Sequence, residues 1–279
     1  MDTANVEAAL ATVTSADGTP IVVERVGAGE PLVMVHGAAV DRSVWRAVAP
    51  ALAERFELWL VARRGRGGSG DGAAYDPERE VEDLRAVFER VGRPLGLFGH
   101  SSGAVLALEA ARRSGLVRRL VLYEPPMAVD GTRRGDEPGG PKARVEALLA
   151  AGDRAGAVRT FYRLGPRVGE EALARMEAGR SWPVVLALAH TLPYDMAVVG
   201  AFGFDPDRLA QVRQPTLLLV GGASSPWDHR VAEALAGALP SARVVVLPEQ
   251  GHRAMATAPE LLAGEVAAFL GAGSTEPSP

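Results

Sequence analysis

The chain has 279 residues, and its hydrophobic fraction of 47% is ordinary for a soluble globular protein that buries a sizeable core. Its formal net charge is −4 and its Arg pairs are scattered along the sequence, which argues against a nucleic-acid-binding protein, because such proteins gather basic residues on one face. The absence of cysteine excludes disulfides, thiolate zinc sites and cysteine nucleophiles.

Short apolar segments alternate with helical patterns from the start of the chain to residue 125, which is typical of βαβ units in a mostly parallel sheet. The segments 9–15 and 19–27 flank Asp17-Gly18 and predict an opening β-hairpin. Further strands are expected at 31–37, 56–62, 95–99 and 117–124, with helices near 43–54 and at 77–92 and 102–114.

No strand pattern is present from residue 126 to about 210. A polar loop rich in glycine and proline at 130–142, which we expect to be mobile, with a hinge at 139–141, comes first. Helices follow at 142–151, 154–164, 169–178 and 183–199, and the alternation resumes with strands at 215–222 and 242–248 and helices at 228–239 and 258–270. We therefore expect a core domain formed by 1–125 and 211–270, an inserted helical block at 126–210 and a disordered tail at 271–279.

The sequence GHSSG at 99–103 lies between a predicted strand and a predicted helix, which is the context of a nucleophile elbow. Glycines at 99 and 103 allow the sharp turn that exposes the central side chain. The alternative is an ordinary Ser/Gly turn between a strand and a helix. In this context we interpret Ser101 as a nucleophile.

A serine nucleophile needs a base, and the sequence GH at 251–252 places His252 after the last predicted strand. Ligands bind at this edge of open α/β sheets, although a surface histidine in a loop is the alternative interpretation. The other four histidines fit the role less well. His36 and His100 adjoin tight turns, His190 lies in the helical block, and His229 begins a helix.

Taken together, these features resemble the α/β-hydrolase superfamily over nearly the whole chain. The segments that carry the resemblance are VHG (35–37), RRGRGGSG (63–70), GHSSG (99–103), VLYEPP (121–126), PTLLLVGG (215–222) and GH (251–252). The resemblance implies an α/β-hydrolase fold, with 126–210 as a helical cap inserted after the sixth strand. It also implies an oxyanion hole formed by the backbone amides of Ala38 and Ser102.

The acid of the expected triad departs from the commonest family pattern. Most members carry Asp shortly after the strand at 215–222, but this chain has Ser224 near that position, and Asp228 comes later, where a helix is expected to begin. Glu124, at the end of the strand 117–124, occupies the alternative acid position that some α/β hydrolases use. A carboxylate that ends an apolar strand requires a partner. We favour Glu124 and keep Asp228 as the alternative.

A second departure is Ala62, where the family usually has Asp before the sequence RRGRGGSG. We expect this change to leave Arg63 or Arg64 without its usual partner. The same segment satisfies G-x-G-x-x-G, but the helix and the acidic residue of a dinucleotide site do not follow it. No histidine spacing matches a metal site either, so no cofactor or metal is implied.

The resemblance predicts a serine hydrolase with Ser101, His252 and Glu124 (or Asp228) as its triad. Its substrate is expected to be a small apolar ester, lactone or thioester, bound with help from Trp182, His190 and Tyr194, and also Phe202 and Phe204, unless these residues form the core of the cap. Two alternatives stay open: a cyclase, acyltransferase or carbon–carbon bond hydrolase with the same site, and a ligand-binding receptor.

Neither a signal peptide nor a membrane-spanning segment is recognisable in the sequence. We therefore expect a cytoplasmic protein whose partner is the small-molecule substrate, with no nucleic acid and no membrane. A homodimer is left open beside a monomer.

Overall fold

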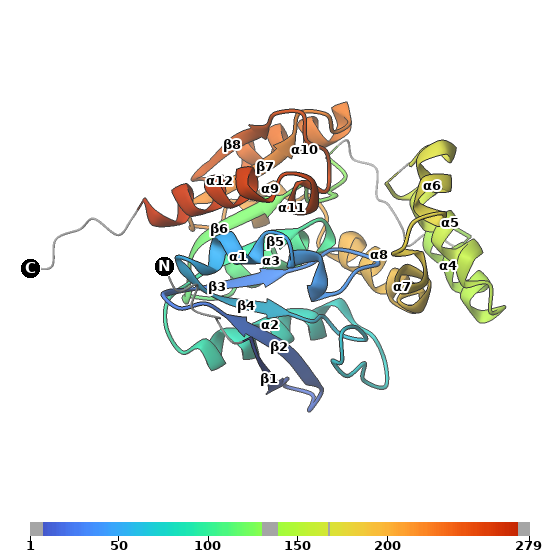
Figure 1. The fold of residues 1–279 in the computed structure, drawn as a ribbon, viewed down its shortest axis with the longest axis horizontal. Coiled ribbons are helices and arrows are strands. Elements are labelled where there is room, and N and C mark those ends of the chain that lie inside the picture. Colours follow the sequence, from blue (N-terminus) through green and yellow to red (C-terminus); the bar gives the residue numbers. More distant parts are fainter. Residues whose placement is uncertain (1–7, 130–138, 167, 273–279) are drawn as a thin grey trace, which may run out of the picture.

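The computed structural model describes residues 8–129, 139–166 and 168–272, and the strands in this part of the chain form one eight-stranded sheet (Figure 1). The strand order is β1-β2-β4-β3-β5-β6-β7-β8. Strands β1 and β2 form an antiparallel hairpin, β2 pairs antiparallel with β4, and every later pair is parallel. The strands are β1 (Ala9–Thr14), β2 (Pro20–Val26), β3 (Glu30–Val35), β4 (Phe56–Val61), β5 (Leu95–His100), β6 (Val117–Tyr123), β7 (Thr216–Gly221) and β8 (Ala242–Leu247).

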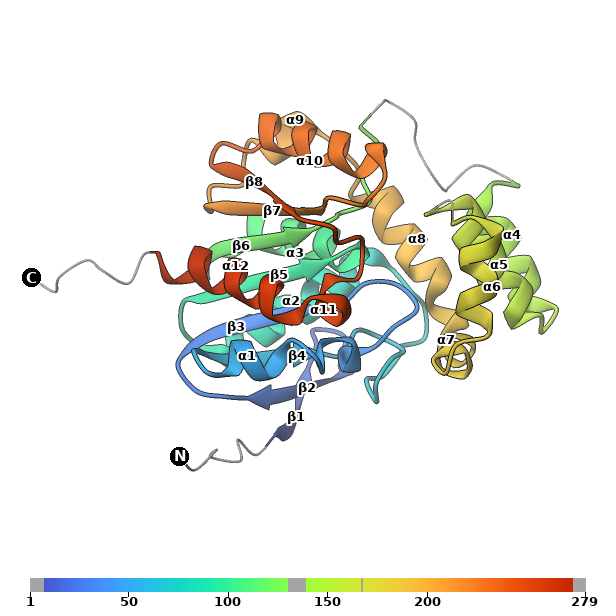
Figure 2. The same cartoon turned by 45° about the horizontal axis from the view of Figure 1, so that its top comes forward.

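Helices cover both faces of this sheet, as Figure 2 shows. One face carries α2 (Pro77–Val91), α3 (Ser102–Arg112) and α10 (Pro226–Ala238). The other carries the 3-10 turn η1 (Arg42–Trp45), α1 (Ala49–Ala53), α11 (Ala254–Thr257) and α12 (Pro259–Gly271). This arrangement confirms the expected α/β class with helices on both sides of a mostly parallel sheet.

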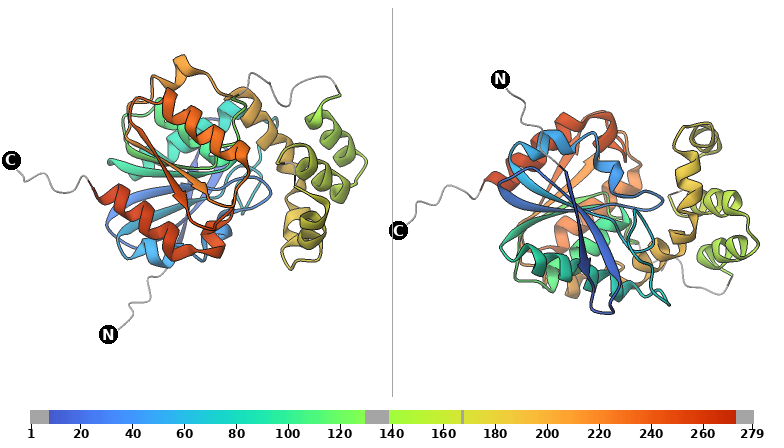
Figure 3. Two further views of the ribbon diagram at one scale, coloured as in Figure 1. Left: turned by 90° about the horizontal axis from the view of Figure 1, so that it is seen from above. Right: turned by 60° about the horizontal axis from the view of Figure 1, so that its bottom comes forward.

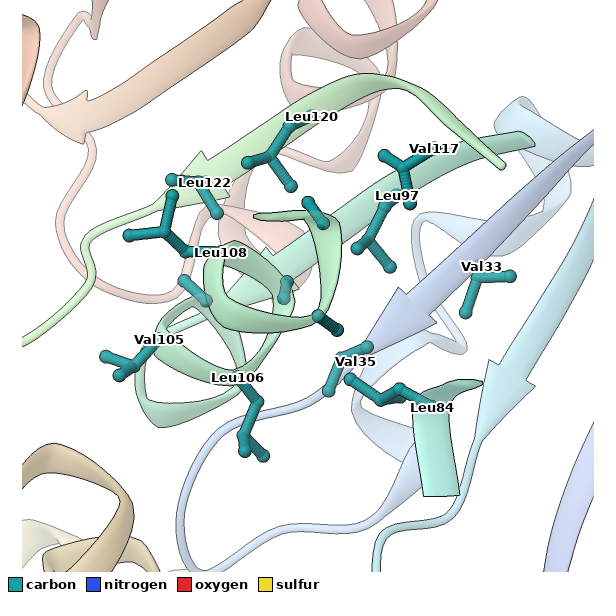
Figure 4. Packing of buried hydrophobic residues seen from close by; sticks show 14 of the residues in the cluster. Val33, Val35, Leu84, Leu97, Val105, Leu106, Leu108, Val117, Leu120 and Leu122 are labelled. Carbon is teal, nitrogen blue, oxygen red and sulfur yellow. The ribbon is translucent and has the colours of Figure 1, made fainter. Parts of the chain in front are cut away.

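Side chains along each central strand alternate between the two faces, because successive Cβ atoms point to opposite sides. In β3, Val33 and Val35 join the core under α2 and α3, whereas Leu32 and Met34 join the core under α1 and α12. Figure 4 shows the first of these cores, where α3 packs on the strands through its apolar side. Both faces of the sheet are therefore buried, so a binding site on the sheet has to lie at the ends of its strands.

A set of helices is inserted between β6 and β7. These are α4 (Pro141–Ala150), α5 (Arg154–Leu164), α6 (Glu170–Glu177), α7 (Trp182–Ala187), the 3-10 turn η2 (Ala189–Thr191), α8 (Leu192–Ala201) and α9 (Pro206–Leu209). Helices α4 to α7 stand apart from the sheet in both views of Figure 3, whereas α8 runs back along α3. One apolar cluster joins these helices to Ala38 and Ala39 in the loop after β3.

One long helix over 183–199 was expected, and this prediction is wrong: the segment is divided into α7, η2 and α8. Pro193 explains the break, because it has no N–H and its ring would collide with a carbonyl of the preceding turn. The helix expected near 43–54 is likewise divided into η1 and α1. The expected mobile loop falls mostly on 130–138, and the expected tail on 273–279; both lie outside the described residues. No helix in the described part of the chain has the length and apolarity needed to cross a membrane.

Candidate active site

Ser101 lies at the junction of β5 and α3, where the backbone turns sharply. Its φ of 55° and ψ of −127° are values that residues other than glycine rarely adopt. The turn leaves no room beside it: a Cβ on Gly99 would lie 2.5 Å from the Cα of Ala104, and one on Gly103 would overlap the His36 carbonyl. Both glycines are therefore required by close packing, and backbone strain of this kind is concentrated at functional sites.

A hydrogen bond of 2.5 Å joins Nδ1 of His252 to Oε2 of Glu124. His252 lies in the loop after β8 with its side chain 48% exposed, whereas the Glu124 side chain, directly after β6, is 1% exposed. The other carboxylate oxygen accepts hydrogen bonds from Gly221 N at 2.8 Å and from Ser224 Oγ at 2.5 Å. Burial raises the pKa of Glu124, but the bonds from His252, Ser224 and Gly221 outweigh it and hold this pKa below its usual value. Glu124 is therefore an ionised acceptor at neutral pH.

Asp228 has a separate set of contacts at the start of α10. Its Oδ2 accepts a hydrogen bond from Ser225 N at 3.0 Å, and its own N–H donates to Ser225 Oγ at 3.4 Å, so the two residues form a capping box. Ser224, near the position where the family resemblance suggests an aspartate, instead donates to Glu124. The structure thus brings Glu124, and not Asp228, to the imidazole of His252.

Ser101, Glu124 and His252 follow β5, β6 and β8 and meet at the C-terminal edge of the sheet. The His252 ring packs against that of His100, the residue before Ser101, with ring centroids 4.5 Å apart. None of the hydrogen bonds formed by the described residues joins Ser101 to His252. Hydrogen bonds between a nucleophile and its base are often long before substrate binds, so this geometry is compatible with a catalytic pair.

Two residues that our sequence reasoning did not assign to the site hold the loop of His252. Nε2 of His100 donates to the His252 carbonyl at 2.9 Å. The Tyr123 hydroxyl donates to the Gly251 carbonyl and accepts from Ala254 N. Burial, and next the nearby His252, hold the pKa of His100 well below its usual value, so its ring is neutral. His100 and Tyr123 directly precede Ser101 and Glu124, and that position is the one sequence signal that could have identified them.

The backbone amides of Ala38 and Ser102 flank Ser101. Gly37 lies against the nucleophile, since a Cβ on Gly37 would come within 2.8 Å of the Ser101 Cβ. Ser102 begins α3, so its N–H has no acceptor within the helix. Neither amide is used in any hydrogen bond among the described residues. Both are therefore free to bind an external acceptor.

The usual aspartate is absent at Ala62, but neither Arg63 nor Arg64 is left unpaired. Arg63 donates to both carboxylate oxygens of Glu80, at 2.7 and 2.8 Å, and to Asp195 Oδ1 at 2.7 Å. Arg64 has its own two partners, which are Asp83 and Asp17. The partners come from the opening hairpin, α2 and α8, and these replace the aspartate that is absent before Arg63.

The expected substrate-contacting residues have different surroundings. Trp182 packs on the apolar cluster that includes Ala38. His190 lies with Nε2 3.2 Å from the Gly65 carbonyl, and Tyr194 donates to Asp71 and stacks on Tyr75 with centroids 3.9 Å apart.

Phe202 and Phe204, the other two aromatic candidates, pack with the core under α3. The Phe202 ring lies 5.9 Å from the guanidinium of Arg113, at the end of α3 away from Ser101. These contacts favour a packing role for Phe202 and Phe204 over contact with substrate.

We predict that Trp182→Ala changes substrate preference more than stability. Trp182 is half-buried and packs on the same apolar cluster as Ala38, so its removal is expected to shift the ratio of kcat/KM between short and long acyl esters by about tenfold. Val184→Ala on the same helix, where Val184 is 50% exposed, is the matched control and should leave this ratio unchanged. A large fall in Tm with unchanged kcat/KM ratios would identify Trp182 as a core residue instead.

Known proteins and a family model resemble this chain over most of its length. The model of the alpha/beta hydrolase family matches residues 32–265. A pimeloyl-(acyl-carrier protein) methyl ester esterase from Nitrosomonas europaea is 29% identical over 250 residues, which cover 86% of this chain and 95% of that protein. An N-formylmaleamate deformylase from Pseudomonas putida is 30% identical over 237 residues, which cover 81% and 83%. The crystal structure of an alpha/beta hydrolase from Sphaerobacter thermophilus is 42% identical, covers 93% of this chain and 100% of its own, and has a TM-score of 0.86.

Proposed function

The chain belongs to the alpha/beta hydrolase family, and on this basis we propose that it is a serine hydrolase that cleaves a carboxylic ester, lactone or thioester through an acyl-enzyme on Ser101. The observation that carries this proposal is the 2.5 Å hydrogen bond from Nδ1 of His252 to Glu124, at the sheet edge where the strained and partly buried Ser101 also lies. This bond fixes the proton on Nδ1 and leaves Nε2 as the basic nitrogen.

The first half of the proposed reaction forms the acyl-enzyme. Oγ of Ser101 forms a bond to the acyl carbon while its proton passes to Nε2 of His252, and the carbonyl electron pair moves onto the oxygen. The amides of Ala38 and Ser102 stabilise that negative oxygen, and the Glu124 carboxylate stabilises the imidazolium. The bond to the leaving oxygen or sulfur then breaks, and His252 returns the proton to that atom.

Hydrolysis of the acyl-enzyme repeats these steps with water as the nucleophile. Water gives its proton to Nε2 of His252 as its oxygen bonds to the acyl carbon. The bond to Ser101 then breaks, Ser101 regains the proton, and the carboxylic acid is released. Every proton moves between groups that the chain, the substrate or the attacking water supplies.

We propose further that the inserted helices 126–210 act as a cap and give the substrate its apolar surroundings. Ala38, an expected oxyanion donor, packs on a cluster formed by α4, α5, α7, η2 and α8. This contact supports an acyl or ring portion that is apolar and lies under these helices. The activities named for the two relatives, a methyl ester esterase and an N-formylmaleamate deformylase, support acyl-group hydrolysis in general.

The wild-type protein tests the proposal directly. It should react with a fluorophosphonate probe, and mass spectrometry should locate the label on Ser101. It should also hydrolyse at least one member of a panel of 4-nitrophenyl esters, lactones and thioesters. The expected products are acid and 4-nitrophenol in equal amounts from an ester, acid and thiol in equal amounts from a thioester, and a hydroxy acid from a lactone. Labelling without hydrolysis would favour a cyclase or acyltransferase, and ligand binding with neither labelling nor hydrolysis would favour a receptor.

A further inference from the structure

Four buried charged residues connect the inserted helix α8 to the core beside Ser101. Arg63, Arg66, Glu80 and Asp195 each have side chains no more than 2% exposed. Asp195, on α8, accepts a hydrogen bond from Arg63 at 2.7 Å, and its Oδ2 lies 3.1 Å from Nη2 of Arg66. The two cations and two anions balance, which is the condition for charges to be stable at this depth.

This cluster reaches one expected oxyanion donor through the Ser102 side chain. Oγ of Ser102 donates to Oδ1 of Asp195 at 2.7 Å, and Arg63 donates to Oγ at 3.0 Å. Ser102 directly follows the nucleophile, and its own N–H points out of the first turn of α3. The orientation of that residue is therefore fixed at both its side chain and its backbone.

The cluster reaches the other donor through the peptide bond between Gly37 and Ala38. Nη1 of Arg66 donates to the Gly37 carbonyl at 3.2 Å. His36 donates to the same oxygen from Nδ1 at 2.9 Å, because its Nε2 accepts from Arg63 N and therefore carries no proton. Burial, and then the charges of Arg66 and Arg63, lower the pKa of His36 to about 3, which keeps this ring neutral.

The carbonyl of Gly37 and the N–H of Ala38 belong to one planar group, so whatever holds the carbonyl also aims the N–H. A cationic donor on the carbonyl also withdraws electrons from the amide and strengthens the N–H as a donor. Asp195 contacts Arg66, which contacts this peptide, and Asp195 also contacts Ser102 directly. One carboxylate on an inserted helix thus joins both sides of the site that would hold the oxyanion.

We propose that Asp195 is a positioning residue that aligns the amides of Ala38 and Ser102 for stabilising the oxyanion. The inference depends on the proposed serine hydrolase function. Asp195 touches neither the nucleophile nor the base, so its effect is on the stabilisation of the transition state. Without the charge of Asp195, the two buried guanidiniums would face only the Glu80 carboxylate, and Arg66 would lose its ion-pair partner.

The test uses two variants, Asp195→Asn and Ser102→Ala, and the matched control Asp83→Asn. Asp83 forms an equally buried bond with an arginine of the same loop, Arg64, but it contacts no residue of the expected oxyanion hole. For 4-nitrophenyl acetate, kcat is expected to fall about tenfold to a hundredfold in both test variants, somewhat less than the loss of a whole oxyanion donor. KM should change little, and the midpoints of the pH–rate profile should stay in place, because His252 and Glu124 are untouched.

Because the two variants disrupt one contact, the double variant should lose about as much kcat as the worse single variant. Each assay is made below the Tm of the variant. If Asp195→Asn does not fold, the result for Ser102→Ala alone tests the inference. The inference is overturned if the folded variants keep the wild-type kcat, or if Asp83→Asn loses kcat to the same extent. A wild type that is inactive towards every acyl substrate would instead reject the proposed function, and with it this inference.

Discussion

Replacing Ser101 with alanine is expected to lower kcat for ester hydrolysis by about a million-fold, to the level that binding and the oxyanion donors alone provide. The physical reason is that the next hydroxyl, that of Ser102, is buried and donates to Asp195, so it cannot take over the role of Ser101. Labelling by a fluorophosphonate should disappear in the same variant. Both effects are measured on protein whose Tm matches the wild type, and little change in Tm is expected because alanine is no bulkier than serine in this turn.

Ser114→Ala provides the matched control, since Ser114 lies just beyond the other end of α3 and its hydroxyl accepts only the Leu116 amide. This variant should keep both the label and the activity. If the label survives in Ser101→Ala, or is found on Ser102, then Ser101 is not the nucleophile. The geometry of the turn would then have to be explained by packing alone.

The sequence predicted the positions of Ser101 and His252 because local signals carry them. A hydroxyl between two glycines, after an apolar strand and before a helix, has few structural explanations, and the histidine follows directly after the last predicted strand. The sequence favoured Glu124 as the acid but did not exclude Asp228. It depends on whether the loop after β7 turns back towards His252 or begins a helix, which a capping box decides locally.

The charge cluster around Asp195 could not be predicted from the sequence, because its members come from distant parts of the chain. Arg63 and Arg66 follow β4, Glu80 lies in α2 and Asp195 lies in an inserted helix. The same distance explains why the replacement partners of Arg63 and Arg64 could not be foreseen from Ala62. A local motif shows that the usual aspartate is absent. It carries no information about the distant carboxylates that pair with Arg63 instead.

Helix ends were predicted where capping signals are local, as at α2, where Asp76 caps the first turn and Gly92 ends the helix with a φ of 70°. The division of 183–199 was missed because the apolar pattern continues across Pro193. The consequence for the site is direct. The break starts a new helix at Leu192, and Asp195 in its first turn faces the buried arginines.

Glu124→Gln is expected to lower kcat by about four orders of magnitude with the fold intact, whereas Asp228→Asn should stay near the wild type. A glutamine at this position can still accept from Gly221 and Ser224 through its carbonyl oxygen, so the loop after β7 should keep its structure. Its NH2 group would then face Nδ1 of His252 as a donor. The imidazole would respond by carrying its proton on Nε2, the nitrogen that must accept the proton of Ser101.

The experiment measures kcat for one ester in both variants. It also measures the Tm of both variants and of the wild type across a range of pH. Because the folded protein holds the pKa of Glu124 below its usual value of 4.5, ionised Glu124 stabilises the wild type above that pH, and this contribution is lost as the pH falls through the lower folded value. The Glu124→Gln variant should therefore lose less stability than the wild type as the pH falls. Asp228→Asn alters only the capping box of α10 and should cost about 1 kcal/mol of stability at most. If Asp228→Asn were instead the inactive variant, α10 would have to unwind during catalysis to bring Asp228 to His252, and the bond between Glu124 and His252 would not be the catalytic one.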